Sequence, residues 1–261
     1  MNRTLIGGIA RATATAGAAD AARRLTAPAI DTSHLSGKTA VVTGAGSGIG
    51  RSLATLLAQR GAVVHAADVN GDSAEAVARQ IRAAGGSATA HAVDVTDAGA
   101  VARLADRAFQ DGPVHLLFNN AGIGHAGSVA DTPLGDWRRL IDVNLMGVVH
   151  GLHAFLPRLL AQDGPAHIVD TASMAGLVPA AGLSAYSATK AAVVALSDAL
   201  DVELAGTRVR VSALCRASSI PPSSRPPPCA ASGPDGKLAR WICTPGGARR
   251  RMSWPGRRWP R

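Results

Sequence analysis

The sequence predicts an α/β domain built on a doubly wound parallel sheet. Two observations indicate this fold class. Short apolar runs alternate with amphipathic helical patterns between Gly37 and Leu214, and a glycine-rich turn directly follows the first apolar run. Such alternation is typical of βαβ units, whose parallel sheet is covered on both faces. At 261 residues the chain is long enough for one such domain with an ample core.

The predicted elements follow one another in a regular order. Strands are expected at 39–43, 62–67, 88–93, 114–118, 166–171 and 208–214. Helices are expected at 52–60, 72–84, 98–110, 134–162 and 185–204. Each strand is a short apolar run, and each helix has apolar residues at helical spacing. No apolar run reaches the roughly 20 residues that a membrane span needs.

The formal charge of +9 is confined to one end of the chain. Residues 216–261 carry ten Arg or Lys and one Asp, whereas residues 1–215 carry equal numbers of basic and acidic residues. The predicted fold itself therefore gives no reason to expect a nucleic-acid partner. A nucleic-acid or membrane-surface binder that acts through the basic segment stays open as an alternative.

The composition divides the chain into three parts. Residues 1–36 are rich in Ala and Thr and are expected to be a flexible extension, with a transit-like targeting segment as the alternative. Residues 37–215 form the predicted domain. Residues 216–261 hold nine of the fifteen prolines and three of the four tryptophans, which fits neither strand nor helix. We expect this tail to be disordered, and a shifted reading frame explains its composition better than a lineage-specific tail.

The first predicted strand ends in the glycine-rich turn Thr43-Gly44-Ala45-Gly46-Ser47-Gly48-Ile49-Gly50. Glycines there let the backbone turn sharply and approach a pyrophosphate, which the N-terminus of the following helix attracts. Asp68 ends the second strand, where a carboxylate can accept both adenosine ribose hydroxyls and repel a 2′-phosphate. Because Ser47 leaves the turn without a basic residue, NAD is favoured over NADP.

Polar residues also follow the next two predicted strands. Asp94 and Val95 end the third strand, and Asn120, Ala121 and Gly122 follow the fourth. Ligands of doubly wound sheets bind at the carboxyl ends of the strands, so these residues are candidate cofactor contacts.

The only tyrosine of the chain, Tyr186, precedes Lys190 by four residues and follows Ser173 by thirteen. Residues at i and i+4 share a helix face, so the ammonium can lie close to the phenol. A free phenol titrates near about 10, and a neighbouring cation favours its phenolate form. On spacing alone, an ordinary helix pair explains this motif equally well.

Taken together, these motifs resemble the short-chain dehydrogenase/reductase family over residues 37–214. The resemblance rests on the glycine turn, Asp94, the Asn119–Gly122 segment, Asn144, Ser173, and Tyr186 with Lys190. It implies a Rossmann-like fold and NAD(P)-dependent interconversion of an alcohol and a ketone or aldehyde.

The resemblance also implies a role for each catalytic residue. Tyr186 would be the acid/base and Ser173 would hold the substrate oxygen. Lys190 would bind the nicotinamide ribose and lower the pKa of the tyrosine. Asn144 would hold a water that links Lys190 to solvent. The family's two long helices imply a homodimer or homotetramer.

The chain departs from the family after the sixth strand. Family members continue with Pro-Gly and a Thr, whereas Cys215 is followed here by Arg216, Ala217 and Ser218. The C-terminal part of the fold is therefore expected to be incomplete, with an uncovered sheet edge and an apolar patch. A catalytically impaired dinucleotide-binding protein is the resulting alternative.

The remaining candidate groups indicate no metal site or disulfide framework. His150 and His153 share a helix face without an evident third ligand, and Cys215, Cys229 and Cys243 lack metal-ligand spacing. A reduced cytoplasmic setting is expected.

Overall fold

The computed structural model describes residues 35–216. Residues 1–34 of the expected extension and residues 217–261 of the expected tail lie outside the described residues. The expectations of flexibility, of disorder and of a shifted reading frame therefore stay predictions.

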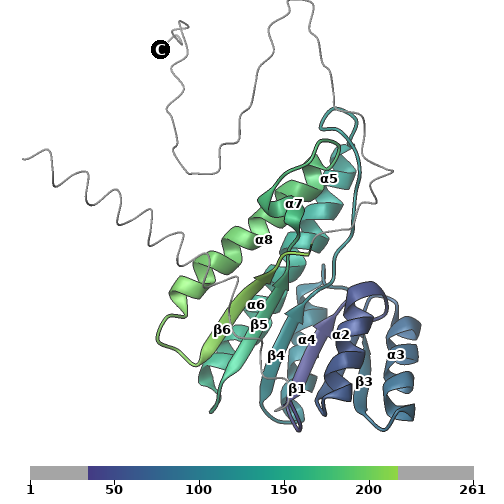
Figure 1. The fold of residues 1–261 in the computed structure, drawn as a ribbon, viewed down its shortest axis with the longest axis vertical. Helices are drawn as coiled ribbons and strands as arrows, with labels where there is room; N and C mark the ends of the chain where they lie inside the picture. Colours follow the sequence, from purple (N-terminus) through teal and green to yellow (C-terminus); the bar gives the residue numbers. More distant parts are fainter. Residues whose placement is uncertain (1–34, 217–261) are drawn as a thin grey trace, which may run out of the picture. The chain divides into compact units, whose positions relative to one another are not determined.

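A parallel sheet forms the centre of the described segment (Figure 1). Its six strands are β1 (Thr39–Thr43), β2 (Val63–Asp68), β3 (Ser87–Ala92), β4 (Val114–Asn119), β5 (Ala166–Thr171) and β6 (Val209–Leu214). Their spatial order is β3-β2-β1-β4-β5-β6, and every neighbouring pair is parallel. Because the chain starts inside the sheet and winds outward in both directions, the doubly wound, Rossmann-like prediction is confirmed.

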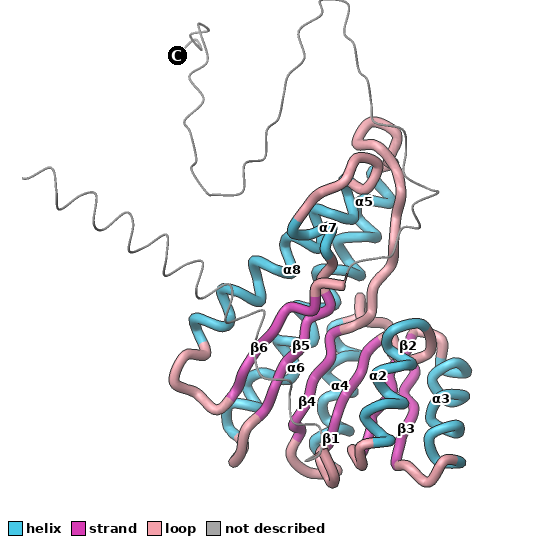
Figure 2. The backbone as a smooth tube through the Cα atoms, in the orientation of Figure 1, coloured by secondary structure: helices cyan, strands magenta, loops and turns pink. Residues whose placement is uncertain are grey.

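Helices connect the strands (Figure 2). They are α2 (Gly48–Gln59), α3 (Gly71–Ala83), α4 (Ala98–Gln110), the continuous run α5 (Leu134–Ile141), η2 (Asp142–Met146) and α6 (Gly147–Ala161), then α7 (Met174–Leu177) and α8 (Ser184–Glu203). Two features were not predicted. The helix α2 begins at Gly48 rather than Ser52, so the last glycines of the turn are already helical, and the short helix α7 follows Ser173.

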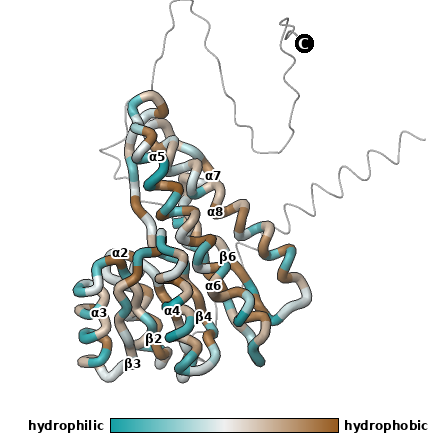
Figure 3. Tube along the Cα trace, turned by 180° about the vertical axis from the view of Figure 1, so that it is seen from behind, coloured by the Kyte–Doolittle hydropathy of each residue, from teal (hydrophilic) through white to brown (hydrophobic). Residues whose placement is uncertain are grey.

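Two apolar clusters cover the two faces of the sheet. One joins Leu104 of α4, Phe155 of α6 and Val193 of α8 to inward residues of the strands, and the other joins Leu57 of α2 and Ile81 of α3 to the opposite face. Figure 3 shows hydrophobic residues along the strands and hydrophilic ones on the outer turns of α3 and α4. This two-sided burial explains why the strands read as continuous apolar runs.

The run from α5 to α6 bears on the expectation that no apolar run is long enough to span a membrane. Leu134–Ala161 is a single helical run that is long and apolar enough, by length and composition, to cross a membrane. Its apolar residues Val148, Leu152, Phe155 and Leu159 belong to the core cluster, where α6 packs on α4 and β4. Packing inside the domain therefore accounts for part of the apolar character of this run, since 39% of its apolar window is buried.

Strand β6 lies at one edge of the described sheet. On the face away from α8, its exposed residues include Arg210 and Ser212, and the Ser212 hydroxyl lies 2.9 Å from Nε2 of His167. Leu214, at the end of the strand, is 37% exposed. The exposed residues of this strand are thus mainly polar, and the expected uncovered apolar patch stays a prediction.

Candidate active site

A cavity of about 1000 Å³ lies at the carboxyl ends of the strands. Nearly all the candidate residues from the sequence line it. They are Gly44, Ser47, Gly48, Ile49, Gly50, Asp68, Asp94, Val95, Asn120, Ala121, Gly122, Ser173, Tyr186 and Lys190. The topology brings them together because the sheet order places β1 between β2 and β4 and places β5 beside β4. Asn144 is the one residue of the predicted set that does not line the cavity, and its side chain is fully buried.

The glycine turn is shaped by close backbone contacts. Gly44 has φ of +66°, and a Cβ on it would lie 2.8 Å from the Ala121 Cα. A Cβ on Gly50 would overlap the Gly44 carbonyl oxygen. These contacts fold the turn tightly against the end of β4, which leaves the first turn of α2 and its free N–H groups directed at the cavity.

The carboxylate of Asp68 is held in place at the end of β2. Its Oδ2 accepts a hydrogen bond from Gly46 N at 2.8 Å, and its Oδ1 accepts one from Asn70 N at 2.9 Å. Each oxygen keeps a further lone pair for a ligand donor. The next residue, Val69, also lines the cavity and carries no charge that would hold a phosphate.

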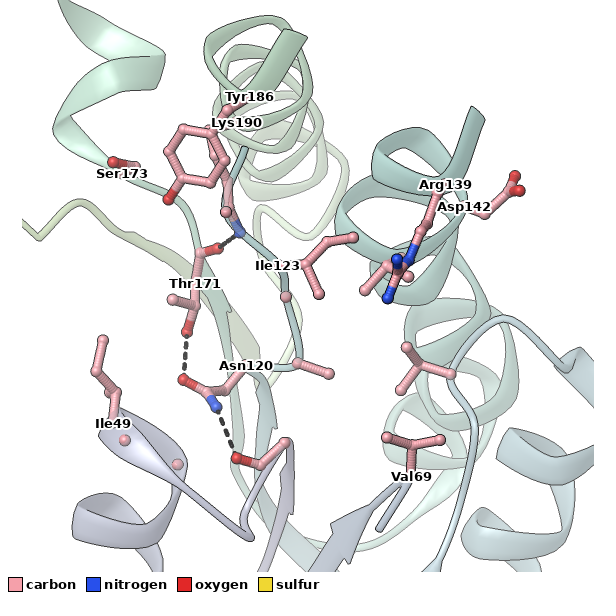
Figure 4. Close-up of a pocket in the computed structure, with 18 of the residues that line it drawn as sticks. Ile49, Val69, Asn120, Ile123, Arg139, Asp142, Thr171, Ser173, Tyr186 and Lys190 are labelled. Atoms are coloured by element: carbon pink, nitrogen blue, oxygen red, sulfur yellow. Dashed lines mark hydrogen bonds between the residues drawn. The ribbon is translucent and has the colours of Figure 1, made fainter. Parts of the chain in front are cut away.

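Asn120 joins the ends of three strands beneath the cavity floor (Figure 4). Its Nδ2 donates to Thr43 O at 2.9 Å, and its Oδ1 accepts from Thr171 Oγ1 at 3.4 Å. The Thr43 hydroxyl in turn accepts from the backbone N–H groups of Asn120 and Ala121. Asn120 therefore has a structural role in addition to lining the cavity.

Ser173 is positioned by helix α7. The residue is the N-cap of this helix, and its Oγ accepts a hydrogen bond from Ala175 N at 3.2 Å. Helix α7 lies very close to α8, because a Cβ on Gly176 would be only 2.6 Å from the backbone carbon of Lys190. Ser173 therefore depends on a glycine contact for its distance from the Tyr186 helix.

Tyr186 and Lys190 lie on α8, as the spacing predicted. Figure 4 shows the Tyr186 ring between Ser173 and Lys190, with its hydroxyl on the Ser173 side. Lys190 is 3% exposed, and its Nζ donates to Thr171 O at 2.6 Å. Burial lowers the pKa of Lys190 to about 8, and the negative charge of Asp170 opposes this decrease.

Asn144 occupies the π-helical turn η2 inside the long helix. Its Oδ1 accepts from Ile123 N at 2.8 Å, and its Nδ2 donates to Ile123 O at 2.9 Å and to Thr189 Oγ1 at 3.2 Å. A Cβ on Gly122 would lie 3.1 Å from Asn144 Oδ1 and 3.3 Å from Lys190 Nζ, so both polar groups border the same glycine. Single π-helical turns inside α-helices are frequent at functional sites.

Two residues next to the site were missed by sequence analysis. Thr171 supplies the carbonyl that binds Lys190, and Asp170 is the fully buried residue that precedes it. Of these residues, only Asp170 could have been noticed in the sequence, because a carboxylate inside an apolar strand is unusual.

The described residues fit a nicotinamide dinucleotide. The glycine cradle would hold the pyrophosphate, Asp68 the adenosine ribose, and Lys190 with Tyr186 the opposite ribose. The cavity extends continuously from Val69 to Ser173, so both halves of such a molecule have lining residues.

Comparison with known proteins agrees with this geometry. A sequence profile of the short chain dehydrogenase family matches residues 38–219. The 1-deoxy-11-beta-hydroxypentalenate dehydrogenase of Streptomyces avermitilis is 43% identical over 195 residues, which cover 74% of this chain and 72% of that protein.

Two solved structures show the same fold. A short-chain dehydrogenase/reductase from Burkholderia phymatum in complex with NAD has a TM-score of 0.68 and 43% identity, covering 69% of this chain and 66% of that one. A metagenomic short-chain oxidoreductase in complex with NADP has a TM-score of 0.66 and 37% identity, covering 70% of this chain and 83% of that one. The match thus spans about two thirds of the Burkholderia protein, and on fold, site geometry and sequence profile alike, this chain belongs to the short-chain dehydrogenase family.

Proposed function

We propose that this chain is an oxidoreductase that uses a nicotinamide dinucleotide to interconvert an alcohol and a ketone or aldehyde. The observation that carries the proposal is the meeting of Ser173, Tyr186 and Lys190 in the cavity that also contains the glycine turn and Asp68. A hydroxyl donor, a phenol and a buried ammonium next to a dinucleotide cradle are the groups that alcohol oxidation requires.

The cofactor is proposed to be NAD rather than NADP. Asp68 presents a charged acceptor to the adenosine ribose, and neither Ser47 nor Val69 offers a cation to a 2′-phosphate. When bound, the nicotinamide supplies the acceptor or donor of the hydride. The residues of the chain bind and orient it and handle the proton.

In the oxidative direction, Tyr186 in its phenolate form takes the proton of the substrate hydroxyl. The C–H bond of the same carbon breaks, its electron pair leaves with the hydride, and the carbonyl double bond forms. Ser173 donates a hydrogen bond to the substrate oxygen, and the Lys190 charge stabilises the phenolate. In the reductive direction Tyr186 returns the proton.

Asn144 is proposed to serve the proton path. It lies beside Lys190 at Gly122 and is fixed by its bonds to Ile123 and Thr189. A water held in this turn would connect the ammonium to solvent after each proton transfer.

A catalytically impaired dinucleotide-binding protein is the second candidate function. The observation that favours it is Arg216, which follows β6 and lines the cavity where family members place Pro-Gly. This candidate predicts cofactor binding without turnover of any alcohol.

Assembly and location are proposed by analogy with the family. The helices α6 and α8 would form the contact of a homodimer or homotetramer in the cytoplasm. Sedimentation of the purified chain would test the assembly, and a purely monomeric species would refute it.

The test of function combines calorimetric binding of NAD with the formation of reduced nicotinamide over a panel of secondary alcohols. We expect Tyr186→Phe to lower turnover about 10²–10⁴-fold while NAD binding stays nearly unchanged, since the lost hydroxyl acts on the substrate proton. Wild-type turnover in the Phe variant would refute the mechanism. Tight NAD binding by a wild-type chain that is inactive on the whole panel would support the impaired protein.

A further inference from the structure

Asp170 is a buried acid that the proposed mechanism leaves unused. It lies on β5 with no exposed surface, in a strand whose buried residues Ala166, Ile168 and Val169 are apolar. A buried carboxylate strongly destabilises a fold unless hydrogen bonds and an opposite charge compensate for its desolvation. Its partners therefore indicate what it does.

Two buried side chains hold the carboxylate. Oδ1 accepts from Asn119 Nδ2 at 2.8 Å, and Oδ2 lies 3.0 Å from Ser197 Oγ, a hydroxyl that is also 2.9 Å from Val193 O. Asn119 and Ser197 are 3% and 2% exposed. A Cβ on Gly151 would overlap Asn119 Oδ1. Helix α6 therefore packs directly on the Asn119 amide and limits its movement away from the Asp170 carboxylate.

The same strand binds α8 a second time, through the next residue. Lys190 Nζ donates to Thr171 O at 2.6 Å, and Ser197 meets Asp170 two helical turns further along α8. Adjacent residues of β5 thus hold two points on one face of α8. Tyr186 lies on this helix one turn before Lys190, so its position along β5 depends on both contacts.

Asp170 and Lys190 also act on each other electrostatically. Burial is the main cause that raises the pKa of Asp170, and the Lys190 charge opposes it together with Asn119 and Ser197. Burial lowers the pKa of Lys190 to about 8, and Asp170 is the charge that raises it.

Other charged or titratable groups occur on the elements packed against α8. In the described range they are Asp136, Arg138 and Arg139 of α5, Asp142 of η2, His167 of β5, Arg210 of β6, and Cys215 and Arg216 after β6. Burial lowers the pKa of His167, which favours its neutral form. All of the arginines and Asp142 are exposed, so solvent screens them. Asp170, in contrast, shares a buried environment with the ammonium.

We propose that Asp170 is a positioning residue for the Tyr186–Lys190 pair. Through Ser197 it fixes α8 against β5, and its buried carboxylate belongs to the residue next to Thr171, whose carbonyl accepts the hydrogen bond of the Lys190 ammonium. The inference rests on the proposed function for its catalytic meaning, although the coupling between Asp170 and Lys190 can be measured without turnover.

The test uses the small number of lysines. The full chain contains Lys38, Lys190 and Lys237, so protein labelled with ¹³C at the lysine ε position gives three side-chain signals. Asp170→Asn keeps the size of the side chain and removes its charge. We expect Lys190 to titrate about 1 pH unit lower in this variant, while Lys38 stays unchanged. Asp201→Asn, the same charge change at a partly exposed site on α8, should leave Lys190 where it is.

The pH profile of turnover supplies the second readout. In Asp170→Asn, the pH above which turnover decreases should become lower, together with the pH at which Lys190 titrates. If Asp170 had only a structural role, the variant would lower the melting temperature and leave this pH unchanged. If Asp170→Asn fails to fold, Ser197→Ala removes one donor to the carboxylate and should move Lys190 in the same direction by a smaller amount. An unchanged Lys190 titration in the folded variant would overturn the proposal. A shifted titration in a chain that turns over no substrate would instead contradict the proposed function.

Discussion

The stability of the domain should decrease in mild acid because of a buried histidine pair. His65 on β2 and His91 on β3 are 1% and 5% exposed, and Nδ1 of His65 lies 3.0 Å from Nε2 of His91. Burial lowers the pKa of both, and for His91 the value falls to about 4 with further contributions from the His65 and Arg107 charges. Asp111, 3.4 Å from His65 Nε2, acts in the opposite direction.

The sign of the pH effect follows from these depressed pKa values. The pair is neutral in the folded state, whereas in the unfolded chain each ring has the ordinary histidine pKa of 6.5. Stability is therefore complete above about pH 6.5 and is lost as the pH falls toward 4. For His91 alone, the difference between 6.5 and about 4 amounts to a loss of about 2 kcal/mol between pH 7 and pH 5. This is a large part of the stability of an ordinary domain.

The assay is urea unfolding of the wild type and of His91→Gln at pH 7 and at pH 5. The glutamine retains a polar contact with His65 but cannot take up the proton. We expect the wild type to lose about 2 kcal/mol more than the variant over this interval. An equal loss in the two proteins would refute the reasoning, because the histidine would then bind protons equally in both states.

Two further predictions concern the cavity. Asp68→Ala should weaken NAD binding at least about tenfold and reduce discrimination against NADP, since a charge-assisted acceptor of roughly 1.5–3 kcal/mol is lost; unchanged calorimetric affinities for both cofactors would show that Asp68 does not touch the ribose. Gly176→Ala should destabilise the domain by about 1–3 kcal/mol and lower turnover, because its Cβ would lie 2.6 Å from the Lys190 backbone and would push α7 and Ser173 away from α8. Gly135→Ala, whose Cβ would meet nothing within 4 Å, is the control for melting temperature, and equal midpoints in the two variants would contradict the close contact.

Much of the fold could be read from local patterns. Apolar runs and helical periodicities gave the six strands and the main helices, since each element encodes its own burial. The predicted helix boundaries were less accurate where glycine occurs both in a turn and in the first turn of the following helix. Gly48 and Gly50 look like turn residues, but both lie in the first turn of α2. Gly48 has a φ of +50°, and a Cβ on Gly50 would overlap the Gly44 carbonyl oxygen. The π turn η2 left no sequence signal, because Asn144 is an ordinary residue in a helical pattern.

The sequence by itself determined the chemistry that the site offers. The glycine turn, Asp68 and the spacing from Tyr186 to Lys190 are short-range features, and helix geometry alone places the last two on one face. Their roles stay proposals, but their presence in one cavity was predictable once the doubly wound sheet was recognised.

Only the tertiary structure decided which residues surround that chemistry. Strand pairing brought Asn119 of β4 to Asp170 of β5, across 51 residues of sequence, and helix packing added Ser197 from α8. The pairing of His65 with His91 arose in the same way from the β2–β3 register. Such contacts depend on how distant segments pack, and no local periodicity encodes them. The low dielectric environment that shifts the pKa values of Lys190 and His91 exists only after this packing is complete.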